Sequence, residues 1–204
     1  NVNGLRMVKE LKGIPCYELE LINTRKKNIC TSRSFSIDVK ELRELKEAVA
    51  NHATNCAMKL RKEKSLASSV VVFIKTNPFK NQDYQYSNSQ KFVMKVPSND
   101  SMEITKNALT LLDKIYKKGY SYKKAGVIVS DIVPQSSRQL SLFYDKDPIK
   151  VNQVMKAVDN VNQTMGRNKV RLAVQGFDRK WRLKQEKLSP CYTTRFSDLL
   201  TIEI

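Results

Sequence analysis

Four segments of this chain alternate apolar and polar residues as half-buried β-strands do, and two longer segments between them have helical spacing. The strand-like segments are residues 29–36, 66–76, 85–96 and 125–133. Apolar residues at three- and four-residue steps run from about residue 42 to 63, and a second such stripe lies between Asp100 and Gly119. The resulting order, β-α-β-β-α-β, predicts an α+β domain. Its four-stranded sheet would be covered on one face by two helices, and the other face would stay open to a partner.

Two acidic pairs stand where the helical stripes begin, at the spacing of a capping box. Asp38 with Glu41 precedes the first helix, and Asp100 with Glu103 precedes the second. In this arrangement each side chain accepts a hydrogen bond from a backbone N–H group that the helix start leaves unpaired. We therefore expect these carboxylates to serve the fold and not to cluster around a catalytic metal.

The two ends of the chain have weaker patterns. Residues 1–24 contain a helical stripe, and the absence of a starting Met predicts that the chain is part of a longer protein. Residues 148–204 predict a small α/β unit, with a helix over 151–165 and short strands over 169–174 and 199–204. About 57 residues are marginal for a core of their own, so we expect this unit to lean on a partner or on the first domain.

Side chains suited to catalysis or metal binding are sparse. His52 is the only histidine, and its place at the edge of a helical stripe favours a structural role. The cysteines are Cys16, Cys30, Cys56 and Cys191. Without a Cys-x-x-Cys pair they exclude a zinc cluster and predict reduced thiols in a cytosolic protein. Trp181 is interpreted as a core residue of the small unit. With no Gly-rich phosphate loop and no catalytic triad, we expect no enzyme within these residues.

The net charge of +17 arises from 37 Lys and Arg against 20 Asp and Glu, and both halves of the chain carry the excess. An excess of this size repels itself, and an anionic partner, nucleic acid above all, relieves the repulsion. The alternative is a surface whose charge only keeps the protein in solution, and the pattern alone leaves both open. The longest apolar run, Val70–Ile74, is too short to span a bilayer. No basic amphipathic helix with an exposed aromatic face stands out, which disfavours a membrane partner.

The open sheet face and the loops beside it are the candidate DNA grip. Serines let a phosphate approach the backbone closely, and lysines neutralise its charge. The candidate residues are Arg25, Lys26, Lys27, Ser32, Arg33, Ser34, Lys75, Thr76, Ser87, Ser89, Lys91, Lys123 and Lys124. Arg33 has the parity of the apolar residues Ile29 and Phe35, so only a bulge or a strand end would aim it outward.

A short apolar motif, Gln139–Phe143, lies in the connection that follows the fourth strand. Bulky apolar side chains are costly to expose in such a polar segment. They either pack back onto the domain or form a linear motif for a partner's pocket. In the second case Leu140, Leu142 and Phe143 supply the apolar contacts, and Gln139 fixes the orientation by hydrogen bonds.

Several separate stretches, in the right order, resemble the C-terminal half of the bacterial UmuC family. They are SRSF at 32–35, FIKTNPF at 73–79, YSNS at 86–89, YKKAGV at 122–127 and LSPCYTTRFSDLL at 188–200. Members of this family are the polymerase subunit of DNA polymerase V, a Y-family translesion polymerase of the SOS response. The resemblance covers nearly the whole chain.

The resemblance implies a domain organisation. Residues 1–24 would end the thumb, 25–136 would be the little finger that grips primer and template, 137–147 a connection with a clamp-binding motif, and 148–204 a C-terminal extension of unknown role. The residues Gln139–Phe143 match the family's Gln-Leu-x-Leu-Phe motif, which docks on the β sliding clamp. The family's catalytic carboxylates and their Mg²⁺ lie in the palm, upstream of Asn1, so we expect no cofactor here.

These expectations combine into one interpretation and one alternative. The chain is expected to be the non-catalytic C-terminal part of an error-prone polymerase that binds damaged DNA and the clamp during SOS mutagenesis. It would act in the cytoplasm, at the nucleoid, and the family implies a UmuD′ dimer and RecA as further partners. The alternative is a basic protein-interaction module without DNA affinity of its own. An RNA-recognition domain is disfavoured, because no matching RNP1 sequence is present.

Overall fold

The computed structural model describes residues 1–18, 25–80, 82–137, 147–178, 180–183 and 188–199. The strands are β1 (Asn28–Val39), β2 (Ser65–Thr76), β3 (Ser87–Ser98) and β4 (Tyr122–Pro134). The α-helices of the described residues are α1 (Val2–Leu11), α2 (Leu42–Lys62), α3 (Ser101–Ile115) and α4 (Pro148–Thr164). From β1 to β4 the order is β-α-β-β-α-β, so the α+β fold predicted from the sequence is confirmed.

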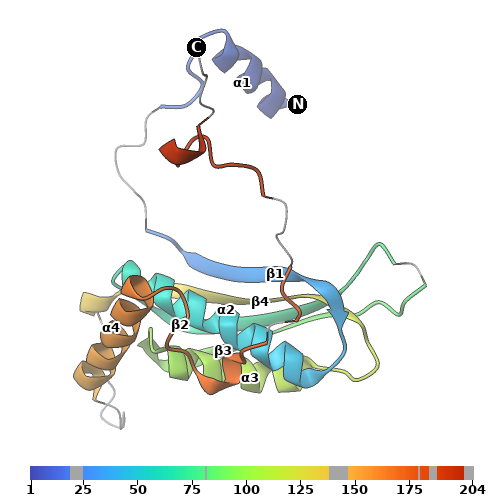
Figure 1. Ribbon diagram of the computed structural model, residues 1–204, viewed down its shortest axis with the longest axis vertical. Coiled ribbons are helices and arrows are strands. Elements are labelled where there is room, and N and C mark those ends of the chain that lie inside the picture. The colour runs from blue at the N-terminus through green and yellow to red at the C-terminus, as the bar shows by residue number, and fades with distance from the viewer. Residues whose placement is uncertain (19–24, 81, 138–146, 179, 184–187, 200–204) are drawn as a thin grey trace.

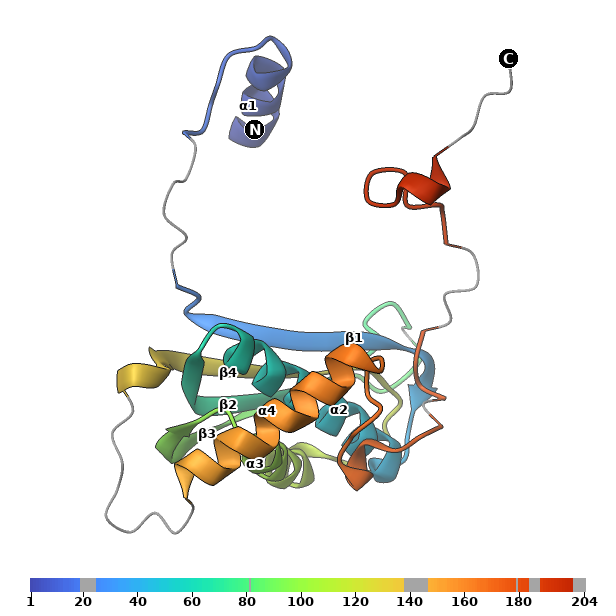
Figure 2. The same ribbon diagram turned by 60° about the vertical axis from the view of Figure 1, so that its left-hand side comes forward.

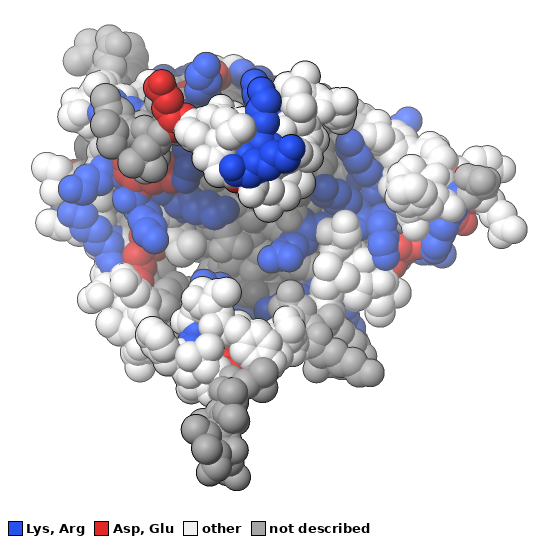
Figure 3. Space-filling model, turned by 90° about the horizontal axis from the view of Figure 1, so that it is seen from above, with Lys and Arg blue, Asp and Glu red and all other residues white. Residues whose placement is uncertain are grey.

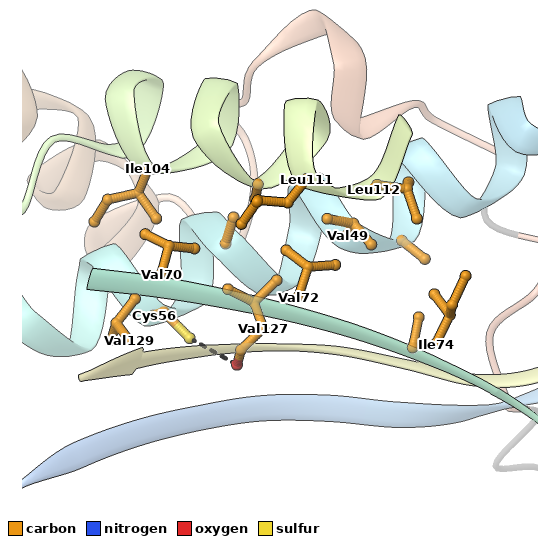
Figure 4. Packing of buried hydrophobic residues seen from close by; sticks show 14 of the residues in the cluster. Val49, Cys56, Val70, Val72, Ile74, Ile104, Leu111, Leu112, Val127 and Val129 are labelled. Atoms are coloured by element: carbon orange, nitrogen blue, oxygen red, sulfur yellow. Dashed lines mark hydrogen bonds between the residues drawn. The ribbon is translucent and has the colours of Figure 1, made fainter. Parts of the chain in front are cut away.

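The four strands form one antiparallel sheet in the order β1-β4-β2-β3, with α2 and α3 packed on one of its faces (Figure 1). The central strands supply most of the sheet's contribution to the core. Val70, Val72 and Val127 are fully buried beneath the two helices. They face apolar helix residues that include Val49 and Leu112 (Figure 4). The period of two along the strands and the stripes along the helices therefore meet in a single core.

Cys56 of α2 belongs to this core. Its thiol donates a hydrogen bond to the carbonyl oxygen of Val127, 3.5 Å away (Figure 4). Burial raises the pKa of the thiol to about 11, against which the hydrogen bond with Thr31 acts only in part. A thiol that stays protonated at neutral pH is a weak nucleophile, so Cys56 is a packing residue.

One of the two expected capping boxes supplies an N-cap, and the other is absent. Asp100 is the N-cap of α3, and its carboxylate accepts a hydrogen bond from Met102 N at 2.9 Å. At α2 the prediction is wrong, because β1 continues as far as Val39 and leaves Asp38 within the strand. The N-cap there is Glu41, whose side chain makes no capping hydrogen bond.

Asp38 has a different role, which is to link β1 to the β2–β3 loop and to β4. Its carboxylate forms ion pairs with Lys80, from the β2–β3 loop, and with Lys123 of β4. The hydrogen bond from Lys80 is the largest influence on the pKa of Asp38, and it holds that pKa below its ordinary value. Asp38 thus pairs with two ammonium groups, and its position inside β1 keeps it away from the start of α2.

The described residues between 147 and 183 lie against the first domain. The fourth helix, α4, is held to the C-terminal end of α2 by a two-pronged ion pair. Arg61 Nε donates to Asp159 Oδ2 at 2.6 Å, and Arg61 Nη2 donates to Asp159 Oδ1 at 2.7 Å. The same guanidinium reaches the Asn99 carbonyl oxygen, 2.7 Å away. The expectation that this unit leans on the first domain is therefore confirmed.

The strand predicted over residues 169–174 is wrong. This segment is irregular and leads into a 3₁₀ turn at Ala173–Gln175. Its backbone finds partners close by, because Val170 N donates to Asn162 Oδ1 at 3.0 Å and the carbonyl oxygen of Val170 accepts from Asn162 Nδ2 at 2.9 Å. At Val170 a side-chain amide of α4 thus takes the place of a backbone partner on a neighbouring strand.

The described residues between 171 and 183, here called the C-terminal strap, run back over α2 (Figure 2). Gln175 is buried, and its carbonyl oxygen accepts a hydrogen bond from Asn51 Nδ2 at 2.9 Å. Trp181 is buried in the main core, and its carbonyl oxygen accepts from Ser36 N at 3.1 Å. The core role expected for Trp181 is confirmed, but the core is that of the first domain.

At the other end of the chain, α1 has the apolar stripe that the sequence indicates. Its large apolar residues, such as Val2, Leu5 and Leu11, are exposed by more than half. None of the residues of α1 is buried. None of the helices formed by the described residues is long and apolar enough to cross a membrane.

Candidate nucleic-acid interface

The face of the sheet opposite α2 and α3, here called the open face, has a composition that follows from the strand register. Directly paired residues of an antiparallel sheet have their side chains on the same face. Read across β1, β4, β2 and β3, three successive rows are Ser34, Lys124, Lys75, Ser87; then Ser32, Gly126, Phe73, Ser89; then Cys30, Ile128, Val71, Lys91. The register therefore gathers seven of the thirteen predicted residues on one surface.

Two lysines stand side by side at one end of the open face. Lys75 and Lys124 are paired on the central strands β2 and β4, and neither forms an ion pair with another described residue. Like charges that face each other directly across a sheet are destabilising. An anion between the two ammonium groups would relieve this repulsion, so the row that contains them is the best anion site of the face.

The middle of the open face is apolar and closely packed. An added Cβ at Gly126 would lie 2.4 Å from Phe73 Cζ and 2.5 Å from Ser32 Cβ, and both distances are too short for real contacts. The Phe73 ring therefore lies across the backbone of Gly126, in a space that only glycine leaves free. The Phe73 ring thus forms a flat apolar surface, here called the apolar floor, between Ser32 of β1 and Ser89 of β3.

The charge at the far end of the face is reduced by Asp131, a residue that the sequence analysis did not single out. Its carboxylate accepts hydrogen bonds from Ser69 Oγ at 2.7 Å and from Lys91 Nζ at 3.0 Å, and these bonds lower the pKa of Asp131. Its backbone has φ +55°, a conformation that Asp tolerates better than most residues. No local sequence signal marks this pairing, because Lys91 is distant along the chain. It makes Lys91 less available to a second anion.

Arg33 does not lie on the open face. It is paired with Ala125 and so shares the side that the helices cover, as its parity in the sequence indicates. The irregularity in β1 begins only after Ser34, too late to turn Arg33 outward. Arg33 is exposed on that side, and the expectation of a contact from Arg33 on the open face is corrected.

Two further predicted residues are occupied by contacts within the fold. Thr76 is buried, and its hydroxyl donates to Gln85 Oε1 at 2.8 Å and so anchors the start of the β2–β3 loop. Lys123 is held by the carboxylate of Asp38, with 3.5 Å between Nζ and Oδ1. Thr76 and Lys123 were predicted to contact DNA from their residue types and their places near loops. Neither property shows that folding gives Thr76 and Lys123 a partner within the protein.

The predicted basic residues before β1, Arg25–Lys27, are all exposed. They meet a second basic surface that the sequence analysis missed. Lys59 and Lys62, in the last turn of α2, line a shallow cavity of about 590 Å³ together with Lys26 and Glu63. In the face that Figure 3 shows, the blue surface of Lys and Arg is more extensive than the red surface of Asp and Glu. The run of basic residues at the end of the helical stripe, Lys59, Arg61 and Lys62, was the sequence signal that could have indicated this surface.

The predicted clamp-binding residues Gln139–Phe143 lie outside the described residues. Within the part of the chain that the structure describes, no group of three or more His, Cys, Asp or Glu side chains is arranged to hold a metal ion.

Comparison with known sequences gives matches along most of the chain. Residues 26–142 match the impB/mucB/samB family C-terminal domain, and residues 152–202 match a domain of unknown function, DUF4113. Protein UmuC of Salmonella typhimurium is 39% identical over 204 residues, which are 100% of this chain and 48% of that protein. Protein ImpB of the same organism is 36% identical over 195 residues, 95% of this chain and 46% of the relative.

A more distant relative is DNA polymerase IV of Clostridium acetobutylicum, 23% identical over 165 residues, 79% of this chain and 39% of that protein. The chain therefore spans about half the length, or less, of the curated relatives it matches.

Two solved structures are similar at low sequence identity. A complex of the β-clamp processivity factor and the little finger domain of PolIV aligns with a TM-score of 0.39 and 18% identity, over 57% of this chain and 99% of the other. An insertion ternary complex of Dbh DNA polymerase aligns with a TM-score of 0.41 and 13% identity, over 66% of this chain and 36% of the other. The fold assigned above rests on the strand order itself.

Proposed function

Since the chain belongs to the impB/mucB/samB family, whose C-terminal domain its residues 26–142 match, we propose that it is the DNA-holding part of an error-prone Y-family translesion polymerase. The polymerase activity and its Mg²⁺ would belong to a palm encoded upstream, and this part would be non-catalytic. It would hold primer–template DNA during SOS repair and mutagenesis, in the cytoplasm at the nucleoid.

The observation that carries the proposal is the pair Lys75 and Lys124 on the open face. Their row is closed on each side by a small hydroxyl residue, Ser34 on β1 and Ser87 on β3. Two ammonium groups between two hydroxyl donors suit the oxygens of adjacent phosphates. An antiparallel sheet with one uncovered face offers these groups on a rigid support.

Such a grip reads the phosphate backbone and not the bases. Phosphate contacts fix position and orientation but carry no sequence information. This suits a polymerase that must follow any template, damaged or not. The apolar floor that Phe73 forms over Gly126 would lie beneath the sugars between the phosphate contacts.

Other partners are proposed on the sequence resemblance alone. Gln139–Phe143 would dock on the β sliding clamp, with Leu142 and Phe143 in an apolar pocket. A UmuD′ dimer and RecA would be further partners of the parent protein.

The test is fluorescence anisotropy of this chain on labelled primer–template DNA over a series of salt concentrations. If about five phosphates are neutralised, log K against log salt should fall with a slope of about −4. Lys75→Ala with Lys124→Ala should weaken binding at every sequence alike. It should also make the slope less negative by about 2, because each lysine releases roughly one counterion.

The matched control is Lys106→Ala with Lys114→Ala. These two lysines are exposed on α3, which covers the other side of the sheet, and their loss removes the same charge. The control should keep most of the slope. Equal losses from both double variants would mean that net charge alone attracts DNA. A flat salt response of the unmodified chain would favour the protein-interaction alternative.

A further inference from the structure

The loop between β2 and β3 exposes two large aromatic side chains. Phe79 is 91% exposed and Tyr84 is 88% exposed. An aromatic ring left in water gives up the apolar burial that it would contribute to a core. Two such rings in one short loop therefore indicate a surface that a partner covers.

The loop is held in shape by side-chain hydrogen bonds. Gln85 Nε2 donates toward three loop carbonyl oxygens, those of Asn77 at 3.1 Å, Lys80 at 2.9 Å and Asp83 at 3.1 Å. At the start of the loop, Phe79 N donates to Asn77 Oδ1 at 3.1 Å. The side-chain amide of Gln85 thus joins both sides of the loop by hydrogen bonds, and these bonds hold the backbone that carries the two rings.

The base of the loop is fixed to the sheet as well. Tyr86 N donates to Thr76 Oγ1 at 3.0 Å, and the Thr76 hydroxyl reaches Gln85. Lys80 is bound to Asp38 of β1. A binding group held in place before its ligand arrives loses less conformational entropy when the ligand binds.

The loop has a hollow beside one of its rings. A cavity of about 510 Å³ is lined by Phe79, Lys80, Gln82 and Asp83. Phe79 offers a flat apolar wall, and the Gln82 amide and Asp83 carboxylate offer donors and acceptors. A nucleobase combines a flat face with a hydrogen-bonding edge, and so has the chemistry that this hollow complements.

The basic residues next to the loop favour nucleic acid, and not an apolar protein surface, as its partner. The loop leaves the sheet directly after the paired residues Lys75 and Ser87, at the end of the open face where Lys75 and Lys124 stand (Figure 1). Aromatic rings next to a positively charged track are the combination by which proteins hold single strands without sequence preference.

We propose that Phe79 and Tyr84 stack on unpaired bases of a single-stranded segment that continues from the duplex held on the open face. The proposal rests on the DNA-holding function proposed above and adds a second site to it. The open face binds the phosphates of paired DNA, and the loop binds the faces of bases that have no partner strand.

The test compares two DNA probes of the same duplex sequence, one blunt and one with a single-stranded overhang. Anisotropy with the whole chain gives the Kd of each. Phe79→Ala with Tyr84→Ala should weaken binding to the overhang probe by roughly tenfold or more and leave the blunt probe within about twofold. Phe79→Trp with Tyr84→Phe keeps the rings and should restore overhang binding.

A control variant and a second readout separate stacking from general effects. Phe196→Ala removes an equally exposed ring, 93% exposed, from a region outside the loop and should change neither Kd. A 2-aminopurine in the overhang should lose fluorescence when it stacks on the unmodified chain, and should keep it with the double alanine variant.

Each other outcome overturns the proposal in a different way. Unchanged overhang binding by the double alanine variant would remove the stacking role and leave the DNA-holding function intact. Equal losses on both probes would assign the rings to the duplex. Absence of DNA binding by the unmodified chain would overturn both proposals, whatever the loop variants do.

Discussion

At the scale of single residues, His52 of α2 is a buried polar group that packs against the C-terminal strap. His52 is only 3% exposed, and its Nε2 atom has no hydrogen-bond partner among the described residues. Its ring lies 6.2 Å from the Trp181 ring, centroid to centroid. Burial, and then the charge of Arg33, lower the pKa of His52 to about 4. A neutral imidazole of α2 is thus packed against Trp181 of the strap.

Stability should therefore decline as the solution becomes acidic. The unfolded chain binds a proton at His52 below its ordinary pKa of 6.5, whereas the folded chain resists until about 4. The contribution is fully present above 6.5, and it falls between these two values. Urea unfolding should show a free energy of unfolding lower by about 2 kcal/mol at about pH 5 than at about pH 7.5.

A variant isolates the histidine from the other titrating groups. His52→Gln should flatten this part of the pH profile, even if it lowers stability at every pH. An unchanged slope in the variant would show that another group is responsible.

At the scale of elements, the helices and strands of the sheet follow their sequence patterns, and the connections do not. Asp38 had the spacing of a capping residue, but it lies within β1 and pairs with two lysines that folding brings near it. The segment expected as a strand over residues 169–174 is irregular, and the backbone of Val170 pairs with the side chain of Asn162 on α4. Local propensity prevails where no long-range partner competes with it.

The joint between α2 and α4 should be measurable as stability. The side chain of Arg61 is only 7% exposed, and Asp159→Ala would leave its charge without a counter-ion. The guanidinium would keep the Asn99 carbonyl and the Ser101 hydroxyl, so we expect a loss of about 2 kcal/mol in the free energy of unfolding. Chemical denaturation at neutral pH measures this difference.

Asp178→Ala is the matched control, because that carboxylate is 81% exposed and lies 3.6 Å from Lys180. It should change stability by less than about 0.5 kcal/mol. A similarly small effect of Asp159→Ala would mean that α4 is not held by this ion pair.

At the scale of the whole molecule, the basic sheet face and the proposed clamp motif are separate contacts. The anion site is built from strands paired far apart in sequence, Lys75 with Lys124, whereas Gln139–Phe143 is a continuous stretch. Contacts that share no residues should be removable one at a time.

This independence predicts a separation of functions. Leu142→Ala with Phe143→Ala should abolish binding to purified β clamp and leave DNA anisotropy within about twofold. Lys75→Ala with Lys124→Ala should do the reverse. Parallel clamp and DNA titrations of both double variants measure this. If either double variant lost both activities while still folded by circular dichroism, the two contacts would be coupled.

Local patterns along the chain predict the types and order of the elements from β1 to β4, and which residues of one strand share a side. These features are local, because a period of two or of 3.6 residues states which side of an element is apolar. The sequence also indicated the family, through short stretches whose order needs no structure to read.

Which strands are neighbours is known only from the folded chain. The order β1-β4-β2-β3 sets Lys75 beside Lys124 and lays Phe73 across Gly126. Folding also decided that Asp131 neutralises Lys91 and that the C-terminal strap closes on α2 instead of folding alone. Each of these contacts joins residues far apart along the chain. Their energies depend on distances that folding creates, and a local pattern carries no information about such distances.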